Sequence, residues 1–580
     1  MPRHLHAVAL ITALLAGGLA AHDAHSQTTP FPPGQVVIGP IGNTDGPTLP
    51  ALTTGADANL YTGSVEGGFV PNAPAQVVRT SVPTQFVRFY KQNNDLTLGP
   101  AVGSWIATSN SVRGLTAAQV KNILALPDLP TSVAIVRVPA GTCILGGPGN
   151  PALGNFPADP PAVPTPGPWG AAGAPQYYIV GQTTTPDCVN PQYIDTSNYI
   201  PQSNMGTYAL AYVPNARSGN TAAVAAALDH AIFPAPFTPM DGVYNSLDFL
   251  NFTDPVAFRN ALSQLSGEIN ADLPSVTLEA ARSFLGILQQ HLQADTSPAV
   301  QESGGLRLWL GTGGGDTNVA GDGNTHDFGM SMVGVVGGVE AALSPQVLVG
   351  GALGYAHTSL SLDGLASGGS ADSYSMAVYG RYSNGPFYTQ GIIGYGFNNF
   401  AVGRSLAFAD QVGSTTTDTN SRAFMSSIDI GYRFPVWAGG SIAPVAGLQV
   451  ISQWQNAFSE YGAGALDLNA DSKSLTSVRG LLGIDVRHHV TVNSSLGLTA
   501  DLRLSWAHDF AGTARDLDQS FQELSSAAFQ VHGAGFSRDA AVIGLGVTTT
   551  GPVRMFIRYD GEYSGAQLSN GGMIGVSTIF

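Results

Sequence analysis

The C-terminal half of the chain alternates apolar and polar residues. Between Leu496 and Trp506, leucine, alanine and tryptophan occupy every second position, with glycine, threonine, aspartate, arginine and serine between them. The segments 373–378 and 553–560 keep the same register. A period of two is typical of β-strands, whereas a helix repeats every 3.6 residues. We therefore predict a β-sheet with one apolar and one polar face.

About twelve strands of this kind are expected in the last half of the chain. We place them at 305–313, 328–343, 346–361, 372–383, 386–401, 422–435, 440–455, 474–488, 494–509, 537–549, 552–562 and 571–580. Every second connection is short and carries turn residues. These short connections are 344–345, 384–385, 437–439, 489–493 and 550–551. The others are longer and polar, and include 312–327, 402–421, 456–473 and 511–536.

This pattern of connections indicates a membrane β-barrel. A soluble sandwich or barrel also alternates, but its loops are of fairly even length. Short turns on one rim and long loops on the other are typical of outer-membrane barrels. Roughly 10 tilted residues are enough to cross the bilayer core, and a closed sheet leaves no unpaired edge in lipid. We predict a mainly β fold with a C-terminal antiparallel transmembrane barrel.

The last predicted strand carries an alternating face of apolar or β-branched residues that closes on an aromatic. This face consists of Ile574, Val576, Thr578 and Phe580. It resembles the signal that the outer-membrane assembly machinery reads on barrel proteins. We therefore expect these four residues to direct barrel assembly.

The composition fits a barrel wall better than a soluble enzyme. Charged residues make up 11% of the chain, and 72 of its 580 residues are glycine. The net charge of −16 and the lack of a segment rich in lysine and arginine argue against a nucleic-acid partner. Since no apolar run of 18 residues follows the N-terminus, we expect no helical membrane span.

The first 26 residues have the layout of a secretory signal peptide. Arg3 precedes an apolar run at 7–19, and small residues stand at 24 and 26, the positions that a signal peptidase reads. We expect cleavage before Gln27 and export through the Sec translocon to the periplasm. The alternative is an apolar helix of a cytosolic protein.

Residues 27–215, which we call the N-terminal module, are expected to form a small α+β fold. A leader rich in proline and glycine at 28–76 shows no periodicity. The expected strands are 86–90, 132–138, 177–180 and 208–213, the expected helix is 116–126, and a proline-rich loop covers 148–168. No repeat of 20 to 50 residues is visible in the module, so a solenoid is not expected.

Cys143 and Cys188 are the two cysteines of the chain. In an oxidising compartment such a pair favours a disulfide, and a loop of this length would contribute about 4 kcal/mol to stability. The crosslink would also hinder passage through a narrow pore, so a bond that forms late and a pair that stays reduced are both open. The spacing of the cysteines and the absence of a nearby histidine match no zinc pattern, so no metal site is expected.

Residues 216–304 change to helical patterns. We expect helices at 221–230, 255–269 and 275–293. The last has one apolar stripe, formed by Leu278, Ala281, Phe284, Leu285, Leu288 and Leu292. The segment is either a small bundle or partner-binding arm, or a linker that enters the barrel, with Leu278, Phe284 and Leu288 on the helix in the lumen.

Motifs in residues 219–580 resemble those of classical monomeric autotransporters of the type V secretion pathway. The segment 261–269, with Leu265-Ser266-Gly267-Glu268, is similar to the family's segment before the translocator. Further similar motifs follow in the family's order at 353–355, 377–380, 430–434, 444–449 and 458–466. The sequence departs from the pattern at Asn270, where many members have histidine, and at Ala443, where an acidic residue is usual.

The resemblance implies a barrel in the bacterial outer membrane that secretes or displays the N-terminal module at the cell surface. The partners that it implies are outer-membrane lipids, the Sec translocon, periplasmic chaperones and the barrel-assembly machinery. The module would be adhesin-like, with a host or surface ligand and a role in virulence. Some relatives release their passenger by cleavage between paired asparagines, but no such pair lies within 275–296. A rival interpretation is a plain porin with a periplasmic domain.

Short motifs of the N-terminal module resemble toxins of the NAD-glycohydrolase and ADP-ribosyltransferase kind. They lie at 87–90, 103–106, 125–127, 138–142 and 176–177. The resemblance implies that Arg88 would grip a pyrophosphate and that Gln176 would orient the ribose. The alternative is that Arg88 sits on a solvated strand face and Gln176 begins an ordinary strand. The sequence shows no nucleophile elbow, His-Glu-x-x-His motif or P-loop, and no cofactor is expected.

Overall fold

The computed structural model describes residues 306–579 apart from 494, 495 and 552, and residues 211–294 apart from 218 and 235–237. Before these it describes 101–149, 174–184, 194–202 and scattered shorter stretches between 37 and 208. The predicted signal peptide, most of the predicted leader, most of the proline-rich loop and Phe580 lie outside the described residues.

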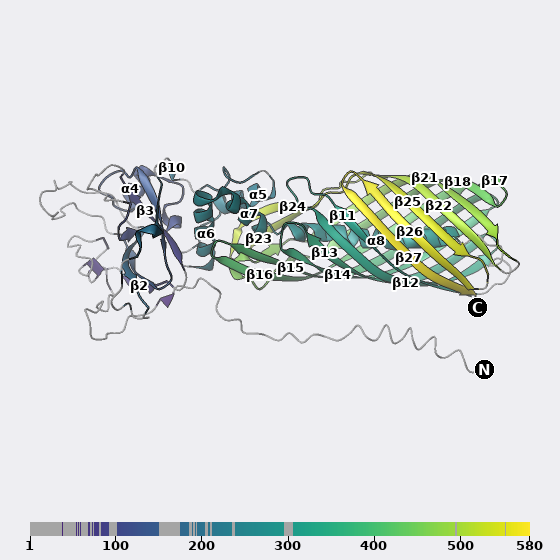
Figure 1. Ribbon diagram of the computed structural model, residues 1–580, viewed down its shortest axis with the longest axis horizontal. Helices are drawn as coiled ribbons and strands as arrows, with labels where there is room; N and C mark the ends of the chain where they lie inside the picture. Colours follow the sequence, from purple (N-terminus) through teal and green to yellow (C-terminus); the bar gives the residue numbers. More distant parts are fainter. Residues whose placement is uncertain are drawn as a thin grey trace, which may run out of the picture. The chain divides into compact units, whose positions relative to one another are not determined.

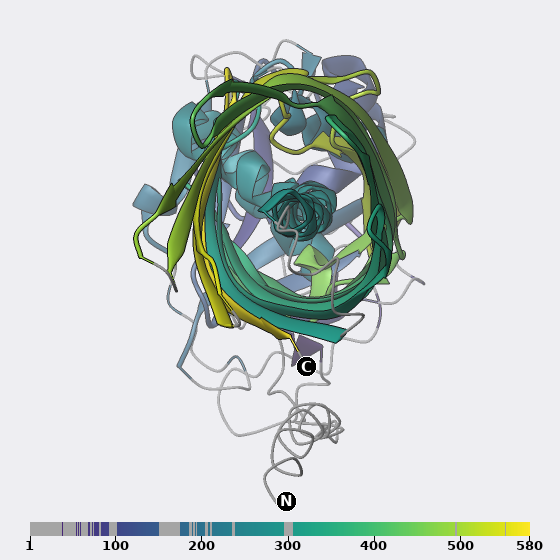
Figure 2. The ribbon, with the colours of Figure 1, turned by 90° about the vertical axis from the view of Figure 1, so that its right-hand side faces the viewer.

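Among the described residues, twelve antiparallel strands form a closed barrel, as predicted (Figures 1 and 2). They are β11 (Leu306–Val319), β12 (Phe328–Ser344), β13 (Val347–Leu362), β14 (Ser367–Asn384), β15 (Phe387–Phe408), β16 (Gln411–Tyr432), β18 (Gly440–Gln455), β21 (Lys473–Thr491), β22 (Gly497–Asp509), β25 (Asp539–Thr549), β26 (Val553–Ser564) and β27 (Gln567–Ile579). The sheet closes because β11 pairs with β27 and β16 pairs with β18. A short strand, β17 (Phe434–Trp437), adds to the start of β18.

The alternation of the sequence is that of an inside-out protein. On β22, Leu504 and Trp506 face outward, and Trp506 is 51% exposed. Arg503 and Ser505, which alternate with them, are buried inside. Outward apolar side chains such as Leu353 on β13 repeat this arrangement around the barrel. The wall is therefore apolar outside and polar inside, the arrangement of a transmembrane barrel.

The long connections are not the plain polar loops that we expected. β15 and β16 continue well past the predicted strand ends and meet at a turn around residues 409–410. The connections at 456–473 and 511–536 contain β19 (Phe458–Ser459), β20 (Leu468–Ala470), β23 (Asp516–Phe521) and β24 (Leu524–His532), which form a four-stranded sheet, and a 3-10 turn, η3 (Gly464–Leu466). The prediction was wrong because their apolar residues, such as Leu406 and Phe521, do not face lipid but pack on helices.

The described residues between 216 and 304 form four helices, one more than predicted for this segment. They are α5 (Asn220–His230), α6 (Pro239–Thr253), α7 (Pro255–Leu265) and α8 (Glu268–Ala294). The extra helix, α6, starts where the Thr238 side chain accepts a hydrogen bond from the Asp241 backbone, with Pro239 in the first turn. None of the helices that the structure describes has the length and hydropathy of a membrane span.

The first three of these helices pack on the long-connection side of the barrel. Their apolar residues share one core with the end of β15, with η3 and with the four-stranded sheet of β19, β20, β23 and β24, for example Leu247 with Leu466 and Phe529. We call this assembly of α5, α6, α7, the β15–β16 hairpin end, η3 and the β19–β24 sheet the cap. Its core explains why the long connections are ordered.

The N-terminal module contains two small sheets. One consists of β3 (Thr84–Tyr90), β6 (Ser132–Val138) and β9 (Tyr199–Gln202), and the other of β1 (Val37–Ile38), β2 (Gln76–Arg79), β7 (Thr142–Pro148), β8 (Pro175–Gln182) and β4 (Trp105–Ile106). Its described residues also include two short helices, α3 (Ser109–Val112) and α4 (Ala117–Ile123), and the paired strands β5 (Leu115–Thr116) and β10 (Thr207–Tyr208). The expected strand at 208–213 is shorter than predicted, because the chain turns at 212–215.

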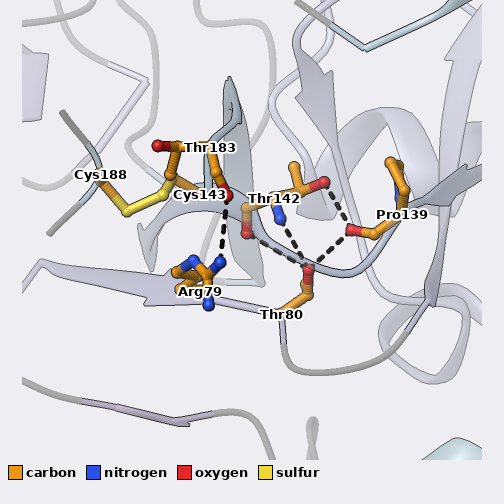
Figure 3. The surroundings of a disulfide bond; sticks show 7 residues. All are labelled: Arg79, Thr80, Pro139, Thr142, Cys143, Thr183 and Cys188. Atoms are coloured by element: carbon orange, nitrogen blue, oxygen red, sulfur yellow. Dashed lines mark hydrogen bonds between the residues drawn. A yellow bond between two sulfur atoms is a disulfide. The ribbon is translucent and has the colours of Figure 1, made fainter. Parts of the chain in front are cut away.

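Cys143 and Cys188 form a disulfide in the described structure, with their Cα atoms 5.9 Å apart (Figure 3). Both are buried in an apolar cluster with Phe69 and Leu145. The backbone beside the bond is held by side chains, because Thr80 donates to the Pro139 carbonyl at 2.8 Å and Arg79 donates to the Thr183 carbonyl at 3.0 Å (Figure 3).

Candidate functional site: the helix in the barrel lumen

Helix α8 runs through the barrel (Figure 2). The stripe that the sequence predicts for it is buried, with Leu278, Phe284 and Leu288 each at most 4% exposed. The stripe packs against small and medium apolar residues of the wall, including Ala352 and Met425. Gly354 on β13 makes room for the helix, since a Cβ there would lie 2.8 Å from the Phe284 ring.

The opposite, polar face of α8 is hydrogen-bonded to the wall. Gln289 donates to Asp429 at 3.1 Å and accepts from Gln449 at 3.0 Å. Arg282 lies 3.4 Å from the Asp509 carboxylate, and Gln290 donates to Asp560. These partners come from four different strands, so they fix both the depth and the rotation of the helix.

Glu340 on β12 is the centre of the contacts at the C-terminal end of α8. Its carboxylate accepts from Arg307 at 3.1 Å and from Tyr379 at 3.2 Å, and lies 2.9 Å from the His291 ring of α8. The same ring stacks on Trp309 at 4.3 Å. This cluster ties the end of the helix to three strands.

The final turn of α8 is capped by a cation from the wall. Arg381 on β14 donates to the Leu292 carbonyl at 2.7 Å. The last carbonyls of a helix have no partner within the helix and carry partial negative charge. The guanidinium therefore satisfies one of them and holds the helix end against the barrel.

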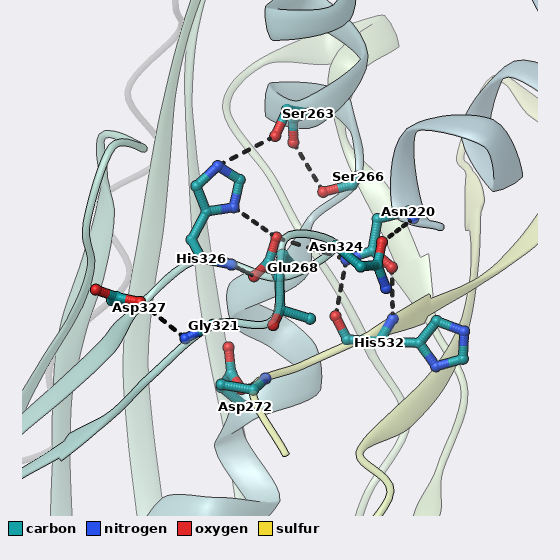
Figure 4. Close-up of polar contacts among 12 residues, drawn as sticks. Asn220, Ser263, Ser266, Glu268, Asp272, Gly321, Asn324, His326, Asp327 and His532 are labelled. Carbon is teal, nitrogen blue, oxygen red and sulfur yellow. Dashed lines mark hydrogen bonds and ion pairs between the residues drawn. The ribbon is translucent and has the colours of Figure 1, made fainter. Parts of the chain in front are cut away.

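The N-terminal end of α8 is held at the rim with the long connections (Figure 4). Glu268, the first residue of the helix, accepts from the backbone of His326 at 2.6 Å and lies 2.8 Å from the His326 ring. Asn220 of α5 exchanges hydrogen bonds with the backbone of His532, both at 2.8 Å. Asp272 accepts from the Ala534 backbone at 2.7 Å. Residues far apart in the sequence thus fix the point at which the helix enters the lumen.

A glycine connects α7 to α8 at this rim. Gly267 has φ +63°, and a Cβ there would lie 2.5 Å from the Leu468 side chain. Both the backbone conformation and the close approach require glycine. The Leu265-Ser266-Gly267-Glu268 motif is therefore a joint, in which Gly267 makes the bend and Glu268 makes the contact with the rim.

The contact between Glu268 and His326 depends on pH. His326 lies in the β11–β12 connection, outside the barrel strands, and its hydrogen bond to the Glu268 carboxylate raises its pKa above the ordinary value of 6.5 although burial opposes this. The stabilisation is complete below the unfolded pKa and is lost as pH rises through the raised pKa. We expect hydrogen-exchange protection of residues 320–327, corrected for intrinsic rates, to fall from pH 5.5 to pH 8.5, and His326→Gln to abolish this pH dependence. Protection that increases with pH would contradict the assignment.

Arg404 and Glu460 form a buried ion pair between the barrel and the cap. Arg404 on β15 donates to Glu460 at 2.8 Å and to the Gln264 carbonyl of α7 at 2.7 Å. Glu460 also accepts from Asn270 of α8 at 2.9 Å. One pair therefore joins β15, the connection after β18, and both helices at the joint. Asn270, which departs from the family pattern, takes part in this contact.

A cavity of about 210 Å³ remains beside the helix. It is lined by the glycines 311, 313 and 315 of β11 and by parts of β26 and β27. The polar groups around it include Glu279 and Arg282 of α8 and Glu562 of the wall. The cavity thus lies between the helix and the barrel wall.

The two residues predicted for an NAD-cleaving site are held by backbone groups. Arg88 on β3 donates to the Trp105 carbonyl at 2.9 Å, and Gln176 on β8 donates to the Leu124 carbonyl at 2.6 Å. The two strands belong to different sheets. Within the ranges that the structure describes, no three acidic, histidine or cysteine side chains are grouped so that they could hold a metal ion.

Three of the four residues predicted to direct barrel assembly lie on β27, and the fourth, Phe580, lies outside the described residues. Ile574 and Val576 point outward and are 58% and 40% exposed, and Thr578 is half-buried. The apolar face expected from the sequence therefore belongs to the outer surface of the barrel.

A family model for the autotransporter β-domain matches residues 308–560. The barrel is an autotransporter β-domain. The resemblance in the motifs is thus confirmed, and with it the location of this domain in the bacterial outer membrane and its role as the translocator of type V secretion. The autotransporter β-domain faces lipid with its apolar surface and encloses α8 with its polar surface.

Two curated relatives, both extracellular serine proteases of Serratia marcescens, are 25% and 26% identical over 348 residues. The match covers 58% of this chain and 32% of each relative. The chain therefore spans about a third of the length of the curated relatives that it matches.

Solved structures of autotransporter domains also match. The translocator domain of NalP from Neisseria meningitidis is 19% identical, with a TM-score of 0.40, and covers 52% of this chain and 98% of that domain. The β-domain of the Bordetella autotransporter BrkA is 15% identical, with a TM-score of 0.37, and covers 48% and 100%. The transport unit of AIDA-I from Escherichia coli is 14% identical, with a TM-score of 0.35, and covers 47% and 90%.

Several residues that hold the helix in the autotransporter β-domain were not singled out from the sequence. Glu268 and Glu460 each stand in a motif, at the ends of 265–268 and within 458–466, but a motif does not say which partner a carboxylate has. Glu340, Arg381 and Arg404 carry a weaker signal: each is a charged residue at an inward position of a barrel strand.

Proposed function

We propose that the barrel exports the N-terminal module and displays it at the cell surface. The direction of α8 carries this proposal. Its first residue, Glu268, contacts the β11–β12 connection on the rim with long loops, and its final turn contacts Arg381, near the short turn after β14. The chain before α8 therefore emerges on the long-loop rim, which is the outer face in outer-membrane barrels.

Protease added to intact cells tests this topology. We expect it to remove the N-terminal module and to leave a fragment that contains the barrel, because α8 and the strands are shielded by the membrane and by the wall. An antibody against a periplasmic protein would show that the cells stayed closed. If the module remained intact on closed cells and was digested after lysis, the proposal would fail, and a barrel with a periplasmic domain would be supported.

For the displayed module we propose a binding role rather than catalysis. The contacts of Arg88 and Gln176 with backbone carbonyls support this, because they occupy the two side chains that an NAD-cleaving site would need. Incubating the purified chain with NAD tests the choice. NAD should remain unchanged, whereas NAD consumption that is abolished by Arg88→Ala and by Gln176→Ala would overturn it.

A further inference from the structure

Helix α6 packs on two bodies at once. Met240, Val243 and Leu247 belong to the core of the cap. On another side of the same helix, Phe252 packs against the core of the N-terminal module, which contains Val87. The polar residues Asp241 and Asp248 of the same helix also contact the module. The helix connects the cap with the displayed module.

The strongest contact in this interface is a buried ion pair. Arg113, which follows α3 of the module, lies 2.5 Å from Asp248 of α6, and their side chains are 4% and 0% exposed. The hydroxyl of Tyr212 donates to the other Asp248 oxygen at 2.7 Å. Both carboxylate oxygens therefore have a charged or polar partner.

Aromatic rings surround the guanidinium of Arg113. It lies 5.1 Å from the ring centroid of Tyr212, 5.0 Å from that of Tyr244 and 5.4 Å from that of Phe233. The cation–π interaction stabilises a cation more when aromatic faces exclude water from it than when the cation is exposed to solvent. Tyr212 precedes α5, Phe233 lies between α5 and α6, and Tyr244 lies on α6, so the rings that surround this cation of the module come mainly from the α5–α6 region.

Two further contacts extend the interface. Asn110 of the module donates to Asp241 of α6 at 2.6 Å. Arg137 on β6 lies 4.5 Å from the ring centroid of Phe249 and pairs with Asp410 at the end of the β15–β16 hairpin. The module thus contacts both α6 and the barrel's own extended hairpin.

We propose that α6 retains the N-terminal module on the translocator without a covalent link, and that the Arg113–Asp248 ion pair is the main contact that holds it. The module would stay on the cell surface after the chain between it and α5 is cut. This inference rests on the proposed function, since it assumes that the module is displayed. It predicts that the N-terminal module stays on the cell surface and is not released.

The test uses the full chain with a site-specific protease sequence inserted after Arg217, an exposed residue before α5. Arg113 and Tyr212 then lie on the module's side of the cut, and Asp248 lies on the barrel's side. After cleavage on washed intact cells, the module should sediment with the cells. Asp248→Asn should raise the released fraction by at least about tenfold, because the buried Arg113 loses its counter-ion. Arg113→Ala should act in the same direction.

Lys91→Ala is the matched control. It removes a cation from the same module, but one that pairs within the module, with Asp128, at a more exposed position. It should leave retention unchanged. Release caused by Asp248→Asn cannot be explained by misfolding of the module, because this substitution lies outside the module.

The outcomes separate this inference from the proposed function. If the protease does not cut on closed cells, the module is not displayed and the proposed function fails. If it cuts and the unaltered module is released into the medium, display stands and retention is overturned. If it cuts and the module of the Asp248→Asn variant is retained as well as the unaltered module, the role of the Arg113–Asp248 ion pair in retention is overturned.

Discussion

Deleting residues 275–293 should convert a nearly closed barrel into an open pore. In planar bilayers the intact protein should give small, flickering currents, and the deletion should raise the conductance by roughly an order of magnitude, because a helix about 10 Å across leaves the interior of a twelve-stranded barrel. In the structure, the helix and its partners leave a cavity of about 210 Å³. Single-channel recording of both proteins measures the effect.

A chain that lacks the N-terminal module but keeps α8 is the control for this deletion. It should conduct like the intact protein, since the helix still fills the lumen. A large, steady conductance of the intact protein would contradict the prediction and favour the porin interpretation.

Arg404→Ala should have the largest effect on the stability of the cap. The change leaves the Glu460 carboxylate, which is 2% exposed, without its counter-ion, and it removes the donor to the Gln264 carbonyl. Breaking a buried pair from one side costs about 3–5 kcal/mol. We expect hydrogen-exchange protection in α7 and in the first turn of α8 to fall accordingly, while the barrel strands keep theirs.

Arg422→Ala provides the comparison for Arg404→Ala. Arg422 lies on the neighbouring strand, β16, and its side chain is exposed on the outer surface. Its loss should change protection little. Equal effects of the two substitutions, or no effect of Arg404→Ala, would show that the buried pair does not hold the cap.

The barrel could be predicted from the sequence because lipid and a polar lumen impose the same two-residue alternation on every strand. Leu504 and Trp506 alternate with Arg503 and Ser505 whichever strands are their neighbours. The rule fails above the membrane. There Leu406 and Phe408 face α6 and α7, and the outer face turns polar, so the ends of β15 and β16 looked like a loop.

The contacts that hold α8 could be predicted only in part. Its apolar stripe gave the face that packs on the wall, because a helical stripe is a local pattern. The partners of Glu268, Gln289 and His291 depend on which strands lie beside the helix and at what depth. That information arises from closure of the barrel and is not local in the sequence. Helix α6 was missed although Met240, Val243, Leu247 and Leu250 recur at helical spacing, so its omission was an error of interpretation and not a lack of local signal.

If the module is exported as proposed, the disulfide sets an order of events. Cys143 lies on β7, and Cys188 follows β8, which pairs with β7 in the sheet. If the disulfide formed first, two segments of the chain would have to pass through the lumen side by side. The lumen also holds α8, so the two segments would have to share it with that helix. Because the periplasm is oxidising, pairing of the thiols competes in time with passage, and the cysteines must stay apart until both have left the pore. Once they join outside, the crosslinked sheet is too wide to return, and the bond makes export a one-way step.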